Sequence, residues 1–245
     1  MISPAEIESA AATFGAPVAQ IERDHLISHV LAALPQSENL VFFGGTALCR
    51  TWLPGLRLSE DIDLLVDDLR DTETLRRTVS RQIQRDFPNP TWISVSSQHD
   101  VDTWMLVTGN IEVKVQFALW RHQWQDAVPV VKQHVELRYT DLPATVEMLV
   151  PTGPGFAAMK IMAWTDRHAP RDLYDLAALA EAGLVNTEAH AIVKLLAGHT
   201  PTANSIGNVP LKKVEAGWAD ELGHQGANTR TPTDCLKVVR DALNG

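Results

Sequence analysis

The sequence predicts an α/β fold: a small twisted mixed β-sheet flanked by helices in residues 1–150, followed by a helical half in residues 151–245. Helical periodicities alternate with short apolar strand patterns up to residue 150. After the proline- and glycine-rich segment 151–155 the pattern is helical only. The composition, with 45% hydrophobic and 21% charged residues, excludes a mainly disordered or fibrous chain.

The first helix is marked by its start. Ser3, Pro4 and Glu6 fit the N-cap, the first and the third helical positions of a capping box. A second helical pattern covers residues 21–34 and precedes a short apolar strand at 40–43. The next helix is expected over 47–53, stopped by Pro54 and Gly55.

The strand that follows, from residue 62 to 66, is apolar and carries acids at its start. A polar helix is expected over 71–85, and a hairpin joins strands 104–108 and 111–117 through a Gly-Asn turn. A period of two begins at residue 91 and covers 91–97, weaker strand patterns cover 128–131, 135–139 and 145–150, and helices cover 156–166 and 171–182.

The charge and cysteine content narrow the class of protein. Lysine plus arginine number 21 and aspartate plus glutamate 30, so the formal net charge is −9. This balance excludes a general basic coat for nucleic acid but allows a local basic patch. Two cysteines make no disulfide framework. The sequence offers no membrane-length apolar run and no secretory signal, so a cytoplasmic protein without a membrane partner is expected.

Two acids lie side by side on the predicted strand. Asp61 and Asp63 are two residues apart, so their side chains share a face of the sheet. Neighbouring carboxylates repel each other unless a cation lies between them, and Mg²⁺ (or Mn²⁺) prefers such oxygen ligands. Taken alone, this pattern is more typical of two solvated acids at a strand edge.

A glycine turn precedes the acids. Gly44, Gly45 and Thr46 lie between a strand and a helix, where glycine lets backbone amides approach a phosphate. The alternative is a tight turn with Thr46 as the helix N-cap. The segment is not a P-loop, because no lysine follows the glycines. Together with the acid pair, the turn predicts a nucleoside triphosphate (NTP) site for two-metal chemistry, to which Arg57 and Ser59 add contacts.

Two segments together resemble the first motif of the AbiEii-type abortive-infection toxins: Phe43-Gly44-Gly45-Thr46-Ala47-Leu48 and Arg57-x-Ser59-x-Asp61-Ile62-Asp63-Leu64. This family, to which the mycobacterial MenT toxins are related, belongs to the DNA polymerase β-like nucleotidyltransferase superfamily. Two later segments are similar to further motifs of the family: Ala157-x-x-Lys160-x-x-Ala163-x-x-x-Arg167 and Arg171-Asp172-x-x-Asp175-Leu176.

The resemblance implies a metal-dependent nucleotidyltransferase, with residues 1–150 as its core and residues 151–245 as a helical domain that completes the nucleotide cleft. It would move a nucleoside monophosphate (NMP) from an NTP to an acceptor, namely the 3′ end of a transfer RNA, as the toxin of a toxin–antitoxin pair. The implied metal ligands are Asp61 and Asp63, and an aspartate, either Asp172 or Asp175, is needed for activity. The implied nucleotide-binding residues are Gly44, Gly45, Thr46, Arg57, Ser59 and Lys160.

One strand departs from the family pattern. The family reads lysine, any residue, aspartate, whereas this chain reads Lys114-Val115-Gln116. Glu112 shares a strand face with Lys114 and Gln116, and it either replaces the missing catalytic acid or is a surface acid paired with Lys114. The departure matters because the third acid often serves as general base.

The RNA-binding surface and the acceptor also leave alternatives open. Arg77, Arg81 and Arg85 line one face of a helix, and they either hold a phosphate backbone or pair with neighbouring acids. Trp92 and Trp104 can stack on bases, although their spacing fits strand interiors. The alternative functions are nucleotidyl transfer to a small molecule or protein hydroxyl, and a degenerate NTP-binding partner.

Overall fold

The computed structural model describes residues 2–207, 209, 211–226 and 230–244. The chain divides into two compact units. Unit 1 consists of Met1–Arg121 and Val131–Val150, and unit 2 consists of His122–Val130 and Pro151–Gly245. The segment 122–130 therefore groups with the helical part of the chain, although it precedes residue 151. Within the described ranges, no helix has both the length and the apolar character that a membrane span requires.

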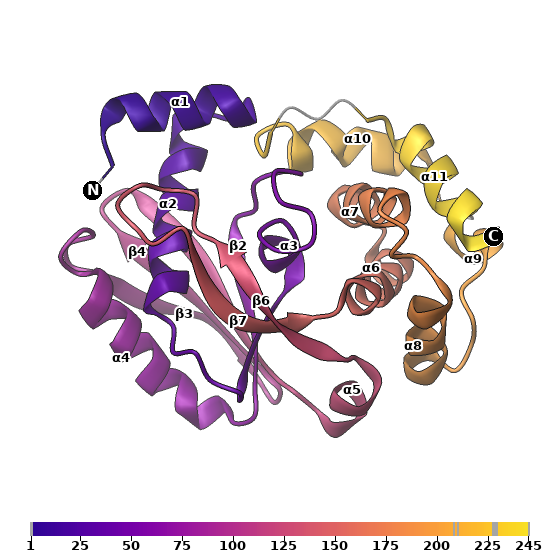
Figure 1. Ribbon diagram of the computed structural model, residues 1–245, viewed down its shortest axis with the longest axis horizontal. Helices are drawn as coiled ribbons and strands as arrows, with labels where there is room; N and C mark the ends of the chain where they lie inside the picture. The colour runs from indigo at the N-terminus through magenta and orange to yellow at the C-terminus, as the bar shows by residue number, and fades with distance from the viewer. Residues whose placement is uncertain (1, 208, 210, 227–229, 245) are drawn as a thin grey trace. The chain divides into compact units, whose positions relative to one another are not determined.

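Unit 1 is built on a mixed β-sheet, which confirms the predicted α/β class (Figure 1). Its helical elements are α1 (Pro4–Phe14), α2 (Val18–Ala33), α3 (Gly44–Leu48), the 3-10 helix η1 (Leu69–Asp71) and α4 (Thr72–Ile83). The strands are β1 (Leu40–Phe43), β2 (Asp61–Val66), β3 (Thr91–Gln98), β4 (Val101–Thr108), β5 (Ile111–Leu119), β6 (Val130–Glu136) and β7 (Thr145–Pro151). In the sheet they follow the order β3-β4-β5-β2-β1-β7-β6.

The strand pairing mixes directions. β1 pairs antiparallel with β2 and parallel with β7, while β2 pairs parallel with β5. The antiparallel pair β4–β5 is the hairpin that the Gly-Asn turn at 109–110 predicts. The β1–β2 and β2–β5 pairs place the start of β2 between the end of β1 and the middle of β5.

The two faces of β2 have opposite character. Ile62, Leu64 and Val66 are buried, whereas Asp61 and Asp63 point to the other face and are partly exposed. The apolar face continues into buried residues of β5, and the helices α2 and α4 pack beside each other over it (Figure 1). At β2 the apolar side chains therefore lie on one side of the sheet, and the acids lie on the other.

The first helix begins as predicted but uses only half of the capping box. The Ser3 hydroxyl accepts from the Glu6 backbone N–H at 3.2 Å, with Pro4 in the first turn. The Glu6 carboxylate instead accepts from the backbone N–H and the hydroxyl of Thr140, at 2.9 and 2.7 Å. Glu6 thus fastens α1 to the loop 137–144, a contact that local sequence cannot reveal.

The helix predicted over 47–53 lies earlier, at Gly44–Leu48, because the glycine turn is itself helical. After Leu48 the chain continues in turns, and Arg50 forms hydrogen bonds with residues outside the helix. Its backbone C=O accepts from Glu136 N–H at 3.0 Å, and its side chain reaches Asp24.

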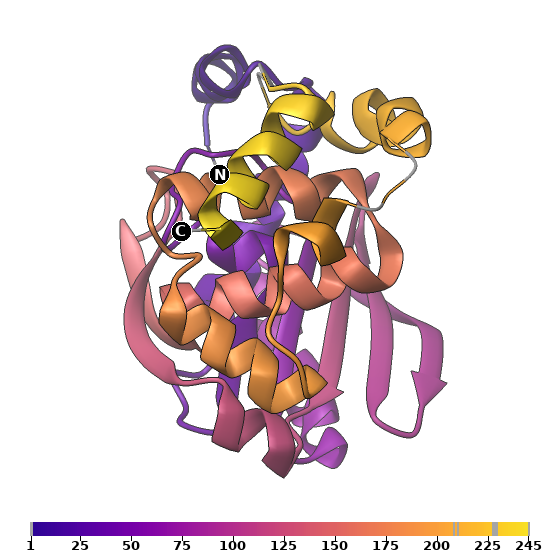
Figure 2. The same ribbon diagram turned by 90° about the vertical axis from the view of Figure 1, so that its right-hand side faces the viewer.

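Unit 2 is helical. Its helices are α5 (His122–Ala127), α6 (Gly153–Arg167), α7 (Pro170–Glu181), α8 (Thr187–Ala197), α9 (Ala203–Gly207), α10 (Leu211–Leu222) and α11 (Pro232–Asn244). Four of them pack in the spatial order α11, α7, α6 and α8 (Figure 2). The Thr152 hydroxyl caps the start of α6 by accepting from Gly155 N–H at 3.2 Å. His168, whose φ is 53°, is the C-cap residue that follows the end of α6 at Arg167.

A buried charged network connects three segments of unit 1. The Asp24 Oδ1 atom accepts from Arg50 Nη2 at 2.8 Å and Arg138 Nη1 at 3.2 Å, and the Tyr139 hydroxyl donates to Asp24 Oδ2 at 3.0 Å. Burial is the largest influence on Asp24 and opposes its ionisation, but the two arginines outweigh it and lower the pKa of this carboxyl. The network joins α2, the turn after α3 and the loop 137–144.

We predict that Asp24→Asn lowers the free energy of unfolding by about 3–5 kcal/mol, because it leaves the buried Arg50 guanidinium without its counter-charge. Urea denaturation at pH 7 measures the loss. The control Glu8→Gln changes an exposed acid of α1 and should stay within about 0.5 kcal/mol of the wild type. A loss below about 1 kcal/mol for Asp24→Asn would show that the network contributes little.

Candidate active site

The glycine turn lies directly against one of the acids. Gly44 has a φ of +79°, in the left-handed region that favours glycine. Phe43 is level with Asp63 in the β1–β2 register, so the turn that follows β1 reaches this carboxylate. A Cβ atom on Gly44 would lie 2.0 Å from Asp63 Oδ2. The position therefore requires glycine both for its backbone angle and for its lack of a side chain.

The second glycine faces a cation. A Cβ atom on Gly45 would lie 2.8 Å from Arg57 Nη2 and 3.3 Å from Ser59 Oγ. Arg57 is 3% exposed, and its Nη1 donates to the Leu58 carbonyl at 2.9 Å, which holds the guanidinium in place. A fixed guanidinium and a hydroxyl next to bare backbone are groups that suit a phosphate.

The Thr46 side chain connects the glycine turn to β2, the strand that carries the acids. It is 1% exposed, and its hydroxyl donates to the backbone carbonyl of Asp61. The interpretation of Thr46 as an N-cap is wrong, because α3 begins at Gly44 and its N-cap position is Phe43, which makes no side-chain cap. The Thr46 hydroxyl therefore stabilises the position of Asp61 relative to the turn.

The neighbouring strand supplies a lysine to the acid pair. Asp61 is level with Lys114 and Asp63 with Gln116 in the parallel β2–β5 register. The Lys114 Nζ atom lies 2.7 Å from Asp61 Oδ2, and the two side chains are 36% and 24% exposed. Lys114 thus pairs with Asp61 rather than with Glu112 in this arrangement. The carboxylates are partly solvated oxygen donors on one face, and this donor set fits a hard divalent cation.

The strand register also shows which residue stands in place of the third acid and where Glu112 lies. Gln116 occupies the position beside Asp63 where the family pattern has an aspartate. Glu112 lies two residues before Lys114 on β5, is exposed, and is level with Val107 of β4. Its backbone carbonyl accepts from Arg23 Nε at 3.1 Å. Glu112 therefore shares the face of the acids but lies away from Asp63, on the far side of Lys114.

Unit 2 brings its three predicted site residues into one buried cluster. The Lys160 Nζ atom of α6 lies 2.9 Å from Asp172 Oδ1 and 2.8 Å from Asp175 Oδ2 of α7. Both carboxylates are fully buried. Arg167 Nε, at the end of α6, donates to Asp172 Oδ2 at 2.6 Å. Asp172 and Asp175, which the sequence leaves equivalent, differ here because Asp172 also binds Arg167.

The positive charges of this cluster lower the pKa of Asp172. Its burial is the largest influence and opposes ionisation, but Lys160 and Arg167 outweigh it and lower the pKa of Asp172 to about 2. At neutral pH the carboxylate is therefore ionised although it is buried. The ammonium of Lys160 is held between two carboxylates on the face of α6 that also presents Arg167.

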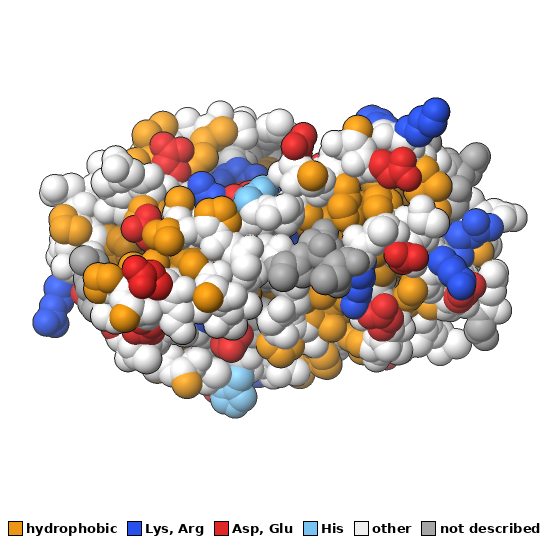
Figure 3. All heavy atoms as spheres, turned by 90° about the horizontal axis from the view of Figure 1, so that it is seen from above, with side chains coloured by type: hydrophobic (Ala, Val, Ile, Leu, Met, Phe, Trp, Pro, Cys, Tyr) orange, Lys and Arg blue, Asp and Glu red, His pale blue; other side chains and the backbone are white. Residues whose placement is uncertain are grey.

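The predicted arginine stripe lies away from the acids. Arg77 and Arg81 are exposed on α4, and Arg85 is exposed just beyond the end of this helix at Ile83. The helix covers the sheet face opposite to Asp61 and Asp63, and Arg77 pairs with Glu73 at 2.5 Å. On the face shown in Figure 3, basic side chains occur in small groups among acidic ones. The stripe thus does not border the acid pair.

The tryptophans near α4 are packing residues. The Trp92 indole donates to Ser80 Oγ of α4 at 2.9 Å, and the Arg76 guanidinium lies 3.6 Å from the centre of the Trp104 ring. Both rings are half-buried and contact α4, as their strand-interior spacing predicts, and base stacking by these two indoles stays a prediction.

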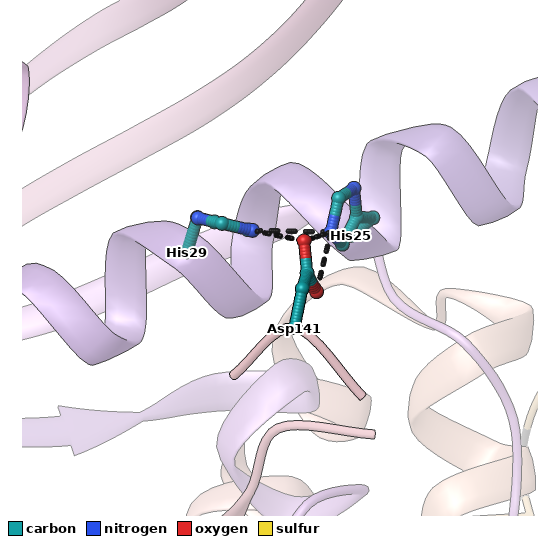
Figure 4. A group of neighbouring side chains, drawn as sticks. All are labelled: His25, His29 and Asp141. Atoms are coloured by element: carbon teal, nitrogen blue, oxygen red, sulfur yellow. Dashed lines mark hydrogen bonds and ion pairs between the residues drawn. The ribbon is translucent and has the colours of Figure 1, made fainter. Parts of the chain in front are cut away.

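Sequence reasoning missed one polar group in unit 1. His25 and His29 of α2 converge with Asp141 of the loop 137–144 (Figure 4). The only sequence signal is the spacing of the two histidines, four residues apart on a helix. Asp141 lies more than a hundred residues away, and nothing local connects it to them.

Comparison with known proteins gives one family. The family model described as "Nucleotidyl transferase AbiEii toxin, Type IV TA system" matches residues 25–233. No curated protein sequence matches the chain.

Among solved structures, JHP933 from Helicobacter pylori is similar with a TM-score of 0.59 and 17% identity, over 92% of this chain and 90% of that one. MenT4, a nucleotidyltransferase toxin of Mycobacterium tuberculosis, is similar with a TM-score of 0.58 and 18% identity, over 99% and 89%. A putative nucleotidyltransferase of H. pylori gives 0.58 and 17%, over 91% and 92%. At these identities the structural likeness shows the fold.

We predict that Gly44→Ala lowers the free energy of unfolding by at least about 1 kcal/mol more than Gly55→Ala does. The two glycines have nearly the same φ, +79° and +78°, so both variants carry the backbone cost of about 1–2 kcal/mol. Only Gly44 would also bring a Cβ atom against Asp63, whereas Gly55 has open space. Urea denaturation measures the free energy of unfolding of both variants. Equal losses would show that the turn accommodates the added Cβ atom without strain.

We predict that Asp172→Asn destabilises the protein by about 3–5 kcal/mol at pH 7, because Lys160 then loses one of its buried counter-charges. The folded pKa of Asp172, about 2, lies below its unfolded value of about 3.9. Its contribution is therefore complete above about pH 5 and is lost as the pH falls towards 2. Urea denaturation at several pH values measures the difference between the variant and the wild type.

The control for this prediction is Asp166→Asn, which changes an exposed acid of the neighbouring helix α6 and should have little effect at any pH. The difference between Asp172→Asn and the wild type should shrink between about pH 4 and pH 2. A difference that stays constant down to pH 2 would contradict the assignment of the lowered pKa to Asp172.

Proposed function

Because the chain belongs to the AbiEii family of nucleotidyltransferase toxins, we propose that this NTP-dependent nucleotidyltransferase transfers an NMP to the 3′ end of a transfer RNA. The acceptor hydroxyl oxygen would bond to the α-phosphorus, the bond from that phosphorus to the β-phosphate would break, and pyrophosphate would leave. The observation that carries the proposal is the contact of Asp63 with the bare backbone of Gly44, with Asp61 two residues away on the same face.

We assign the triphosphate to the glycine turn. Gly45 leaves its backbone open, and Arg57 and Ser59 lie within 3.3 Å of where its side chain would begin. The buried guanidinium presents a permanent positive charge beside the backbone of Gly45. Gly44, Gly45 and Arg57 would thus hold the leaving phosphates, with Ser59 as an additional donor.

Asp61 and Asp63 would hold Mg²⁺ (or Mn²⁺). When bound, such an ion supplies positive charge to the transferring phosphate and to the attacking oxygen. In its absence Lys114 provides a positive charge to Asp61, at 2.7 Å. Gln116 beside Asp63 can donate and accept hydrogen bonds but cannot take up a proton. The proton of the acceptor hydroxyl must therefore go to a carboxylate, Asp61, Asp63 or Glu112, or to solvent.

For unit 2 we propose that Lys160 contacts the triphosphate and that Asp172 and Asp175 position its ammonium group. Two carboxylates within 2.9 Å fix this ammonium on α6, and Arg167 adds a half-exposed cation to the same cluster. Loss of either aspartate would then act through the position of Lys160. This proposal explains how two fully buried acids can be necessary for activity without touching substrate.

The family description refers to a type IV toxin–antitoxin system. We therefore propose that a cognate antitoxin protein counteracts this chain and that the toxin meets its tRNA in the cytoplasm. The choice of tRNA rests on the resemblance of the motifs to the AbiEii and MenT toxins. Transfer to a small-molecule or protein hydroxyl is the competing possibility, and the acceptor experiment below separates it from RNA.

We predict that Asp63→Asn lowers NMP transfer by about 100-fold or more, which corresponds to roughly 3 kcal/mol of transition-state stabilisation. The measurement incubates purified protein with each α-labelled NTP, Mg²⁺ and total tRNA, and follows the label on denaturing gels. Parallel arms offer protein and small-molecule acceptors in place of RNA. Label in those arms but not in tRNA would overturn the acceptor assignment.

Two matched variants complete the experiment. Asp67→Asn changes an exposed acid just beyond the other end of β2 and should keep wild-type transfer. Glu112→Gln tests the third acid: on the register, we expect it to retain transfer within about threefold. An Asp63→Asn variant with full activity would show that the acid pair does not carry the reaction.

A further inference from the structure

The group of His25, His29 and Asp141 is separate from the acids and the glycine turn of the candidate active site. The histidines lie on consecutive turns of α2, and Asp141 enters from the loop 137–144 (Figure 4). Their side chains are 6%, 7% and 16% exposed. The group is therefore nearly buried, with its opening on the side of Asp141.

The three ligand atoms form a small triangle. The His25 Nε2 atom lies 3.0 Å from Asp141 Oδ2 and 3.1 Å from His29 Nε2. The third side, from His29 Nε2 to Asp141 Oδ2, is 3.2 Å. Tetrahedral Zn²⁺ with bonds of about 2.0–2.1 Å needs donor atoms about 3.3 Å apart. The observed separations are thus within about 0.3 Å of those that one zinc ion requires.

No placement of protons lets all three atoms of this triangle form hydrogen bonds with one another. A carboxylate only accepts, so hydrogen bonds from both histidines to Asp141 require a proton on each Nε2 atom. The two N–H groups would then face each other at 3.1 Å. If one nitrogen is instead deprotonated to accept from the other, its lone pair faces the carboxylate oxygen. A cation at the centre accepts both lone pairs and the carboxylate oxygen at once.

The surroundings hold the two imidazoles in place. The ring of Phe87 lies 5.4 Å from that of His25 and 5.0 Å from that of His29, and Tyr139 lies 4.8 Å from His25, measured between ring centres. A neutral imidazole nitrogen fixed in this way is the form that binds a metal ion.

We propose that His25, His29 and Asp141 form a binding site for one Zn²⁺ ion that connects α2 to the loop 137–144. Two imidazoles and one carboxylate select zinc over Mg²⁺, which prefers oxygen ligands alone. Three protein ligands leave a fourth coordination position for water or another ligand. A cavity of about 610 Å³ is lined in part by His25 and Phe87.

The test uses the full chain after treatment with a chelator and titrates it with Co²⁺, whose visible absorption reports coordination by nitrogen and oxygen ligands. We expect saturation at one equivalent, displacement of Co²⁺ by Zn²⁺, and a rise in Tm on addition of Zn²⁺, since a ligand that binds only the folded state stabilises it. Absence of a saturable cobalt spectrum and of a zinc-dependent Tm shift in the wild type would overturn the proposal.

Variants assign the binding to this group. His29→Gln and Asp141→Asn should each weaken Co²⁺ binding at least about tenfold. Asp141→Asn keeps a hydrogen-bond acceptor of the same shape, so it decides the question if His29→Gln does not fold. His99→Gln removes a histidine whose side chain is 92% exposed and should bind as the wild type does. Asp63→Asn should also keep the cobalt spectrum, and its loss there would place the ion at the acid pair instead.

Discussion

The backbone of Gly44 lies against the carboxylate of Asp63, and the candidate active site depends on this close approach. The antiparallel β1–β2 pair brings the turn after Phe43 level with Asp63, and the positive φ of Gly44 turns the chain there without a clash. The other contacts follow from this turn: Gly45 lies beside the Arg57 guanidinium, and the next residue donates to the strand that carries the acids. A side chain at Gly44 would force the turn and the Asp63 carboxylate apart.

Buried charge positions segments that are distant in sequence. In unit 1, Asp24 of α2 binds Arg138 and Tyr139 of the loop 137–144, and the same two segments carry His25 and Asp141. The network around Asp24 therefore orders the loop on which the proposed zinc site depends. In unit 2 a comparable cluster fixes a lysine between two carboxylates. In both places removal of one charge takes a counter-charge away from a buried partner.

The sheet separates the acids Asp61 and Asp63 of unit 1 from the exposed arginines of α4. The acids occupy one face, while α4 with its exposed arginines covers the other, because the strand period of two sends alternate side chains to opposite faces. Within unit 1, Lys114 and Arg57 are cations near the acids. The arginines that the helix pattern places in a stripe therefore do not border Asp61 and Asp63.

The sequence by itself determined the α/β class, the shared face of Asp61 and Asp63, and the family, because these depend on local periodicity and short motifs. Only the tertiary structure decided which residues meet. It paired Lys114 with Asp61, placed Gln116 beside Asp63, and joined two histidines to an aspartate more than a hundred residues away. Strand register and burial fix such contacts, and neither is encoded in a local pattern.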